Sequence, residues 1–269
     1  MLKSRVLTIL VIAPLAIAVV LLFPTMYFAF VMLCCVTAGA YEWGRLLKFS
    51  GGRIATIVLA LALCLWYFES LLRVHQWIYA LAVLWWLLAV PLVVYYQHHQ
   101  KSFLKNAYLQ VVIGSIVLVS AWFALIRLHD IYGHGPALTL YVLMIFWAAD
   151  IGAYVVGKWI GRTKLVSNVS PGKTVEGVFG GLVAVILLGI GGTYYFSIKP
   201  ELTFVFIMLT VVTALLSIVG DLYESIMKRE AGVKDSGKLL PGHGGMLDRI
   251  DSVLAGSPVF TLGYLLLVR

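Results

Sequence analysis

The sequence has few charged residues: Asp, Glu, Lys and Arg together make up 12% of its 269 residues, whereas 62% of the residues are hydrophobic. A soluble globular domain usually carries about twice that share of charge, so this composition excludes an ordinary soluble protein. The hydrophobic runs are continuous and do not alternate with polar residues, which excludes a transmembrane β-barrel. No small-residue cleavage site leads from the first run into a polar segment, so we interpret this run as a retained helix and not as a signal peptide.

Cysteine is scarce as well. Cys34, Cys35 and Cys64 lie within apolar runs, and none of them belongs to a Cys-x-x-Cys pair or has a histidine at ligand spacing. Such cysteines usually serve as small apolar residues, and we expect these three to be buried. The sequence therefore gives no indication of a redox centre or of a cysteine-ligated metal.

Nine apolar runs, each about as long as a helix that crosses a bilayer, follow one another along the chain. They cover residues 6–22, 26–42, 54–71, 77–95, 109–126, 138–156, 178–196, 202–220 and 252–268. The predicted fold class is an all-α polytopic membrane protein with about nine transmembrane helices. Because the polar groups gather in the second half, we expect a transmembrane scaffold over residues 1–137 and a catalytic transmembrane region over residues 138–269, joined in one integrated domain.

Basic residues are distributed unevenly between the two sides that nine spans define. The side with the N-terminus and the loops after the second, fourth, sixth and eighth spans carries sixteen Lys and Arg residues, and the opposite side carries four. The positive-inside rule therefore predicts a cytoplasmic N-terminus. The net charge of +8 then lies on the cytoplasmic face, where it attracts anionic headgroups and nucleotides.

One strongly polar stretch separates the last two spans and reads DLYESIMKREAGVKDSGKLLPGHGGMLDRID. Asp221, Ser225 and Lys228 are spaced so that a helix continuing the eighth span would carry them on one face. Asp248 and Asp251 share a helical face just before the ninth span. Carboxylates on both flanks of a glycine-rich basic turn suit Mg²⁺ with substrate phosphates in its coordination shell. The alternative is salt bridging among exposed charges, which contributes little stability.

Two polar elements precede this stretch. Asp150 lies within the sixth span, where a carboxylate is a functional candidate by default; the alternative is a structural hydrogen bond to a neighbouring helix. The following loop reads SPGKTVEG. It is not a P-loop, because that motif requires a glycine where the chain has Ser167. Ser170, Lys173 and Thr174 can bind the phosphates of a nucleotide, or the two hydroxyls can cap the next helix.

Glu42 is the acidic residue that stands out in the first half of the chain. It falls at the cytoplasmic end of the second span, in the segment AGAYEWGR. Two interpretations stay open: Glu42 orients a residue of the site, or it is an interfacial charge beside Trp43.

Together these motifs resemble the phosphatidate cytidylyltransferase family, also called the CDP-diacylglycerol synthases. The family pattern runs Ser-x-apolar-Lys-Arg, four residues, Lys-Asp, and closes with His-Gly-Gly-apolar-x-Asp-Arg-apolar-Asp. The chain matches this pattern at Ser225, Lys228, Arg229, Lys234, Asp235, Gly237, Leu240, Pro241, His243, Gly244, Gly245, Met246, Asp248, Arg249, Ile250 and Asp251. The SPGKTVEG loop and Asp150 in AADIGAY match two further elements of the family.

The resemblance implies transfer of CMP from CTP to phosphatidic acid, which gives CDP-diacylglycerol and pyrophosphate in phospholipid biosynthesis. It implies the catalytic residues Asp221, Lys228, Arg229, Asp248 and Asp251. It implies the substrate-binding residues Asp150, Ser170, Lys173, Thr174, Ser225, Lys234, Asp235 and His243. By the same resemblance Asp221, Asp248 and Asp251 hold Mg²⁺. Whether a second cation such as K⁺ also binds is left open. His243 is either an acid toward pyrophosphate or a hydrogen-bonding residue of a tight turn.

The partners implied are CTP, phosphatidic acid in the bilayer and a second copy of the chain in a homodimer, with no nucleic acid. An active site at the cytoplasmic ends of the C-terminal spans meets both a cytosolic nucleotide and an interfacial headgroup. The compact chain favours a bacterial source, and hence a multi-pass protein of the bacterial inner membrane.

Two other functions are compatible with parts of the sequence. A CTP-dependent polyprenol kinase would use the same nucleotide and metal but would transfer the γ-phosphate to a lipid alcohol. The full pattern from Lys-Asp to the final Asp-Arg-x-Asp argues against it. A transporter would explain the intramembrane Asp150, but the polar groups gather at one membrane face and not near the midplane.

Overall fold

A computed structural model describes the chain apart from residues 1–12, 73–74, 102–103, 105, 240–243 and 268–269. The first half of the predicted span 6–22 therefore lies outside the described residues. So does His243, together with Leu240 and Pro241 of the family pattern.

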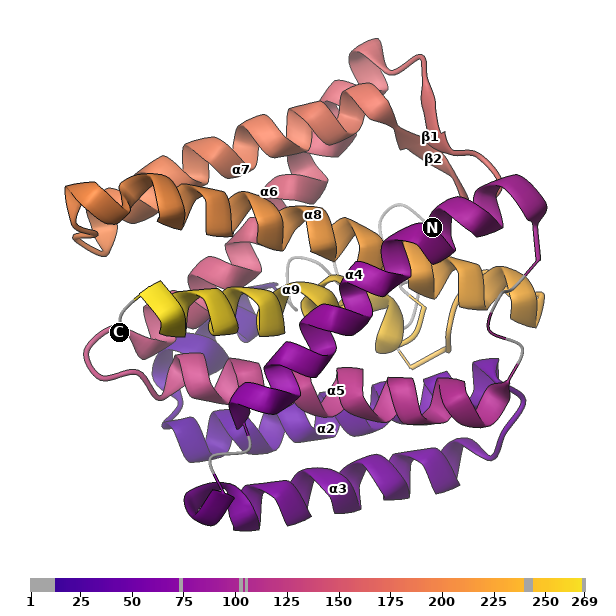
Figure 1. The fold of residues 1–269 in the computed structure, drawn as a ribbon, viewed down its shortest axis with the longest axis horizontal. Helices are drawn as coiled ribbons and strands as arrows, with labels where there is room; N and C mark the ends of the chain where they lie inside the picture. The colour runs from indigo at the N-terminus through magenta and orange to yellow at the C-terminus, as the bar shows by residue number, and fades with distance from the viewer. Residues whose placement is uncertain (1–12, 73–74, 102–103, 105, 240–243, 268–269) are drawn as a thin grey trace.

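Long helices form almost all of the structure (Figure 1). In chain order these are a helix over Ala13–Leu22, α2 (Thr25–Leu46), α3 (Gly51–Leu72), α4 (His75–His99), α5 (Ala107–His129), α6 (Gly135–Ile160), α7 (Val175–Tyr195), α8 (Pro200–Ala231) and α9 (Leu247–Leu267). Over the described residues seven helices are long and apolar enough to cross a membrane, and Ala13–Leu22 and the part of α3 whose side chains are described, Gly51–Trp66, are shorter apolar segments. The predicted all-α polytopic membrane protein is confirmed, and the side on which the N-terminus lies stays a prediction.

Helix α8 extends well beyond the predicted span 202–220. At 1.5 Å per residue its 32 residues reach about 48 Å, whereas the hydrocarbon core is about 30 Å thick. Its C-terminal turns, from about Asp221 onward, continue the helix without a break, as the spacing of the polar residues predicts. The helix ends at Gly232, which adopts the left-handed conformation (φ 73°) that favours glycine at a C-cap.

A short antiparallel hairpin, β1 (Lys164–Val166) and β2 (Ser170–Thr174), fills the connection between α6 and α7. The sequence predicts only a loop here, because the strands are short and β2 contains proline and glycine, which are poor strand formers. Glu176 on α7 accepts hydrogen bonds from the backbone N–H groups of Arg162 and Thr163, at 3.1 Å each, and holds the start of the hairpin. Arg229 Nε donates to the carbonyl of Val169 at 3.3 Å, which ties the turn to α8.

Two close helix contacts bring the ends of the C-terminal helices together. Helices α6 and α7 touch along their backbones: a Cβ at Gly181 would lie 2.7 Å from the carbonyl oxygen of Ala149. Helices α8 and α9 approach as closely, because a Cβ at Gly220 would lie 2.6 Å from the carbonyl oxygen of Asp251. Small residues permit such contacts between transmembrane helices. As a result the hairpin, the end of α8 and the start of α9 meet at one end of the bundle.

Buried tryptophans join the N-terminal helices to α9 and to one another. Trp86 on α4 donates its indole N–H to the carbonyl of Leu254 at 3.1 Å, and Trp122 on α5 donates to the carbonyl of Ala29 at 2.8 Å. Both side chains are almost fully buried. In Figure 1 α9 lies between α5 on one side and α8 on the other, so the core crosses the predicted boundary at residue 137.

The expected burial of the cysteines is wrong for two of the three. Cys34 and Cys64 are exposed, Cys35 is partly buried, and all three are free thiols. An apolar run in a membrane helix has one face toward lipid and one toward protein, and the composition alone does not say which face a given residue occupies.

Candidate active site

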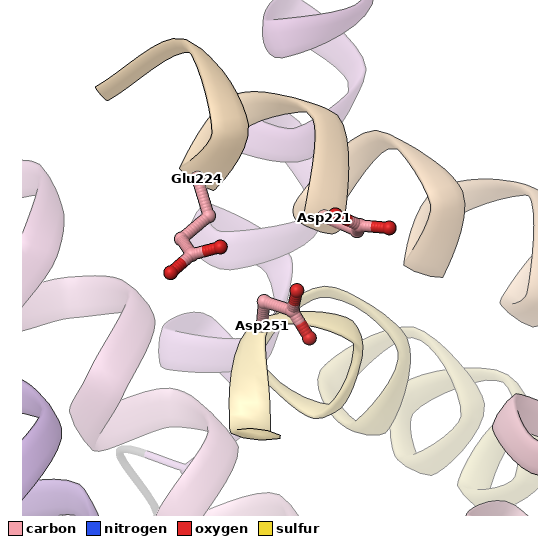
Figure 2. Close-up of side chains that lie close together, drawn as sticks. All are labelled: Asp221, Glu224 and Asp251. Carbon is pink, nitrogen blue, oxygen red and sulfur yellow. The ribbon is translucent and has the colours of Figure 1, made fainter. Parts of the chain in front are cut away.

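Three carboxylates meet where α8 and α9 approach each other (Figure 2). Asp221 and Glu224 lie one turn apart on α8, and Asp251 faces them from α9. Each offers a carboxylate oxygen, and these three oxygens lie within 4.8 Å of one another. We refer to Asp221, Glu224 and Asp251 as the carboxylate cluster. Oxygen donors of this kind are the ligands that hard cations such as Mg²⁺ prefer.

Glu224 is the most deeply buried member of the cluster, with 2% of its surface exposed. Its Oε2 accepts a hydrogen bond from Lys228 Nζ at 2.5 Å. Its Oε1 is also buried and has no hydrogen-bond partner in the part of the chain that the structure describes. A buried carboxylate oxygen without a partner is costly, so this atom is suited to a cation in the cluster.

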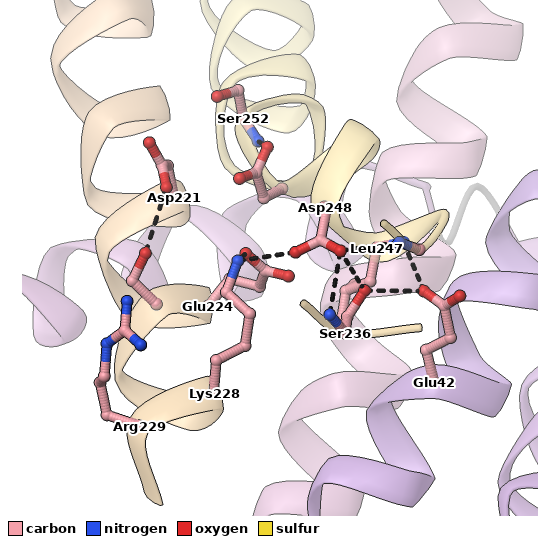
Figure 3. A network of polar contacts seen from close by, with 12 residues as sticks. Glu42, Asp221, Glu224, Lys228, Arg229, Ser236, Leu247, Asp248 and Ser252 are labelled. Carbon is pink, nitrogen blue, oxygen red and sulfur yellow. Dashed lines mark hydrogen bonds and ion pairs between the residues drawn. The ribbon is translucent and has the colours of Figure 1, made fainter. Parts of the chain in front are cut away.

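Asp248 lies outside the carboxylate cluster, on the far side of Lys228 (Figure 3). Its Oδ1 forms an ion pair with Lys228 Nζ at 2.7 Å. Its Oδ2 accepts from the backbone N–H and the hydroxyl of Ser236, both at 2.9 Å, and from the backbone N–H of Gly245 at 2.8 Å. The structure thus brings two of the three predicted metal ligands together with Glu224, and Asp248 instead holds the loop before α9. A metal-binding role for Asp248 stays a prediction.

The SPGKTVEG segment reaches the cluster through Lys173. This lysine lies on β2, and its Nζ is 2.5 Å from Asp221 Oδ2. Ser225 Oγ donates to the other oxygen of Asp221 at 3.4 Å. Asp150 is exposed on α6 and interacts electrostatically with Lys173 and Asp221. The SPGKTVEG segment and the polar stretch on α8 therefore meet at the ion pair between Lys173 and Asp221, and Asp150 lies within electrostatic range of it.

The remaining predicted site residues surround this centre without entering the cluster. Thr174 is buried, and its hydroxyl oxygen accepts from the backbone N–H of Gly177 at 3.1 Å, so it caps α7, one of the two roles that the sequence leaves open. Ser170 is the first residue of β2. Lys234 and Asp235 are exposed in the loop after α8. Contacts of these residues with a nucleotide stay predictions.

Sequence reasoning missed one acidic residue of this region, Glu224, and left the role of a second, Glu42, open. Glu224 follows Asp221 at the same three-residue spacing as Asp248 and Asp251, and that spacing is the signal that could have identified it. Glu42 is buried, with 5% of its surface exposed, so the interpretation as an exposed interfacial charge is wrong. Its carboxylate contacts lie far away in the sequence, where no local pattern points to them.

Comparisons with known proteins agree on one family, and three of them cover nearly the whole chain. The model of the cytidylyltransferase family matches residues 3–267. A phosphatidate cytidylyltransferase of Haemophilus influenzae is 38% identical over 98% of this chain and 99% of its own length. One of Pseudomonas aeruginosa is also 38% identical, over 97% of this chain and 96% of its own length. The phosphatidate cytidylyltransferase of a Synechocystis strain is 48% identical over 46% of this chain.

Proposed function

The chain belongs to the cytidylyltransferase family, and on that premise we propose that it is a phosphatidate cytidylyltransferase. It transfers CMP from CTP to phosphatidic acid and gives CDP-diacylglycerol, a phospholipid precursor, and pyrophosphate. The observation that best supports the proposed location of the active site is the ion pair between Lys173 and Asp221. It joins the SPGKTVEG hairpin, which suits a nucleotide triphosphate, to the carboxylate cluster at the end of α8.

The chemistry needs charge neutralisation more than a strong base. A phosphate oxygen of phosphatidic acid is already ionised at neutral pH and attacks the α-phosphorus of CTP. The bond from that phosphorus to the β-phosphate oxygen breaks, and pyrophosphate leaves. The barrier lies in bringing two polyanions together and in stabilising charge on the leaving group. Lys173 is partly exposed, with 25% of its side-chain surface accessible, so its ammonium can contact a phosphate that arrives from the aqueous side.

The carboxylate cluster fits a divalent cation, because it brings three carboxylates together and Oε1 of Glu224 has no hydrogen-bond partner among the described residues. We propose that Asp221, Glu224 and Asp251 hold Mg²⁺. We also propose that either Asp248 is a further ligand or a second cation such as K⁺ binds beside the first. Bound there, Mg²⁺ supplies the positive charge that phosphate oxygens require. Lys228 keeps Glu224 in place from the opposite side, through the 2.5 Å contact to Oε2.

The proposed setting is the cytoplasmic face of a bacterial inner membrane, with CTP from the cytosol and phosphatidic acid from the bilayer. Its support is the excess of basic residues on one predicted side of the membrane and the length of α8, which exceeds what the apolar core requires. A homodimer is proposed on the family resemblance.

Labelled CTP tests the reaction directly. Purified protein in detergent, given Mg²⁺, phosphatidic acid and CTP labelled at the α-phosphate, should move label into a chloroform-soluble product, and chelation of the metal should stop it. Transfer of only a γ-label, and only to an added lipid alcohol, would support the polyprenol kinase instead. No transfer of either label by folded protein would contradict both enzymes and favour a transporter.

Glu224 should contribute to metal affinity independently of turnover. Mg²⁺ that binds the folded protein raises its melting temperature in a concentration-dependent way, which gives an apparent affinity without substrate. Because Glu224→Gln keeps the shape but removes the charge, we expect the apparent affinity for Mg²⁺ to fall at least about tenfold. Glu201→Gln, at the exposed start of the same helix, is the matched control. If the melting temperature of the wild-type protein did not change with Mg²⁺ concentration, the proposed metal site would be contradicted.

A further inference from the structure

Glu42 takes no part in the chemistry proposed above, yet it is buried beside it. It lies on α2, and its Oε2 accepts hydrogen bonds from Ser236 Oγ at 2.9 Å and from the Leu247 backbone N–H at 2.8 Å (Figure 3). Leu247 is the first residue of α9, where backbone N–H groups lack partners within the helix. One carboxylate of the N-terminal half therefore holds both the loop after α8 and the start of α9.

The loop also leaves room for this carboxylate. A Cβ at Gly237 would overlap the carboxylate of Glu42, and a Cβ at Gly245 would overlap both Glu42 and Ser236. Neither glycine has a positive φ, so the backbone conformation alone does not require glycine at these positions. A side chain at either position would therefore have to displace the carboxylate of Glu42.

A continuous series of polar contacts leads from Glu42 to the carboxylate cluster (Figure 3). Ser236 Oγ lies 2.9 Å from both Glu42 and Asp248, and its single hydroxyl proton serves one of the two carboxylates at a time. Asp248 then contacts Lys228 at 2.7 Å, and Lys228 contacts Glu224 at 2.5 Å. Displacing Ser236 would release Asp248 and, through Lys228, the buried carboxylate of the cluster.

We propose that Glu42 is a positioning residue of cytidylyl transfer, which fixes Ser236 and the first turn of α9 so that Lys228 and Glu224 keep their places. The inference rests on the proposed function. Among the residues that the structure describes, Glu42 hydrogen-bonds to Ser236 and Leu247 and to no predicted substrate-binding residue, so it acts on the rate of the chemical step and not on the affinity for CTP. An acceptor oxygen at this position is the requirement, because both of its contacts are hydrogen bonds from donors.

Steady-state kinetics of two substitutions test this role at a temperature well below the melting temperature of each variant. Glu42→Leu should lower kcat at least about tenfold with little change in KM for CTP, since the buried Leu247 N–H loses its acceptor and Ser236 Oγ keeps only Asp248. Glu42→Gln keeps an acceptor and should stay within about threefold of the wild type. Wild-type kcat in Glu42→Leu would overturn the proposal. An equal loss in both variants that follows their melting temperatures would also overturn it, in favour of a merely structural role.

A second measurement needs no activity. Gly237→Ala should lower the melting temperature, because the new Cβ meets Glu42, and the same substitution in a Glu42→Ala background should have a much smaller effect. If the effects of Gly237→Ala and Glu42→Ala on the melting temperature were additive, the contact between Glu42 and the loop at Gly237 would not be what restrains the loop. If the wild-type protein transfers no cytidylyl group, the proposed function fails and the kinetic role of Glu42 fails with it. The melting temperatures would then decide on their own whether Glu42 holds the loop.

Discussion

Replacing Asp251 by asparagine is expected to lower cytidylyl transfer by at least about a hundredfold. The amide keeps the size of the side chain but removes a charge that a hard cation and its bound phosphates require. The melting temperature without metal should be unchanged or raised, because Asp251 lies with two other carboxylates whose negative charges repel one another. Transfer of label from α-labelled CTP and thermal unfolding in detergent measure the two effects separately. Asp221→Asn should lower turnover in the same way, although it also removes the ion pair with Lys173.

Asp130→Asn is the matched control for both substitutions. Asp130 is an exposed carboxylate at the C-terminal end of α5, at the opposite end of the bundle from the site, and its loss should leave turnover and stability close to the wild type. If Asp251→Asn kept more than about a tenth of the wild-type activity, the carboxylate cluster could not be the charge centre of the reaction.

The part of the site that could be predicted from the sequence is the part that local helical spacing determines. Asp221, Ser225 and Lys228 share a face of α8, and Ser225 contacts Asp221, as their spacing requires. Glu224 was within reach of the same reasoning, because a three-residue spacing places it one turn from Asp221. Its importance lies in burial, with 2% of its surface exposed, and no pattern of charges along a helix reveals how deep a side chain lies.

Contacts between helices far apart in the chain could not be predicted. Glu42 and Ser236 are separated by 194 residues, and Trp86 and Leu254 by 168. Apolar runs predict that helices cross the membrane, but in lipid the neighbours of each helix depend on close packing, which the hydropathy of a run does not encode. The network that joins Lys228, Asp248 and Ser236 depends on which helix lies beside α9. That arrangement becomes visible only in the fold.

Replacing Lys228 by methionine is expected to lower the melting temperature by about 5–10 °C and to abolish turnover. The Lys228 ammonium lies 2.5 Å from Glu224 and 2.7 Å from Asp248, and 9% of the residue surface is exposed. Methionine keeps the apolar stem but leaves two carboxylates without a counter-charge, and breaking a buried pair in this way costs about 3–5 kcal/mol. Thermal unfolding in detergent measures the loss. Lys199 is exposed just before the start of α8 and provides the control: Lys199→Met should leave the melting temperature unchanged.

A second substitution separates the stabilising role of Lys228 from its role in the site. Glu224→Gln in the Lys228→Met background removes one of the two carboxylate charges that lack a counter-charge. It should therefore restore part of the lost melting temperature. Turnover should not recover, because the cluster has then lost both a carboxylate and the ammonium that positions it. If stability did not recover, the ion pair would not be the source of the loss. If turnover recovered as well, the reaction would require neither the carboxylate of Glu224 nor the ammonium of Lys228.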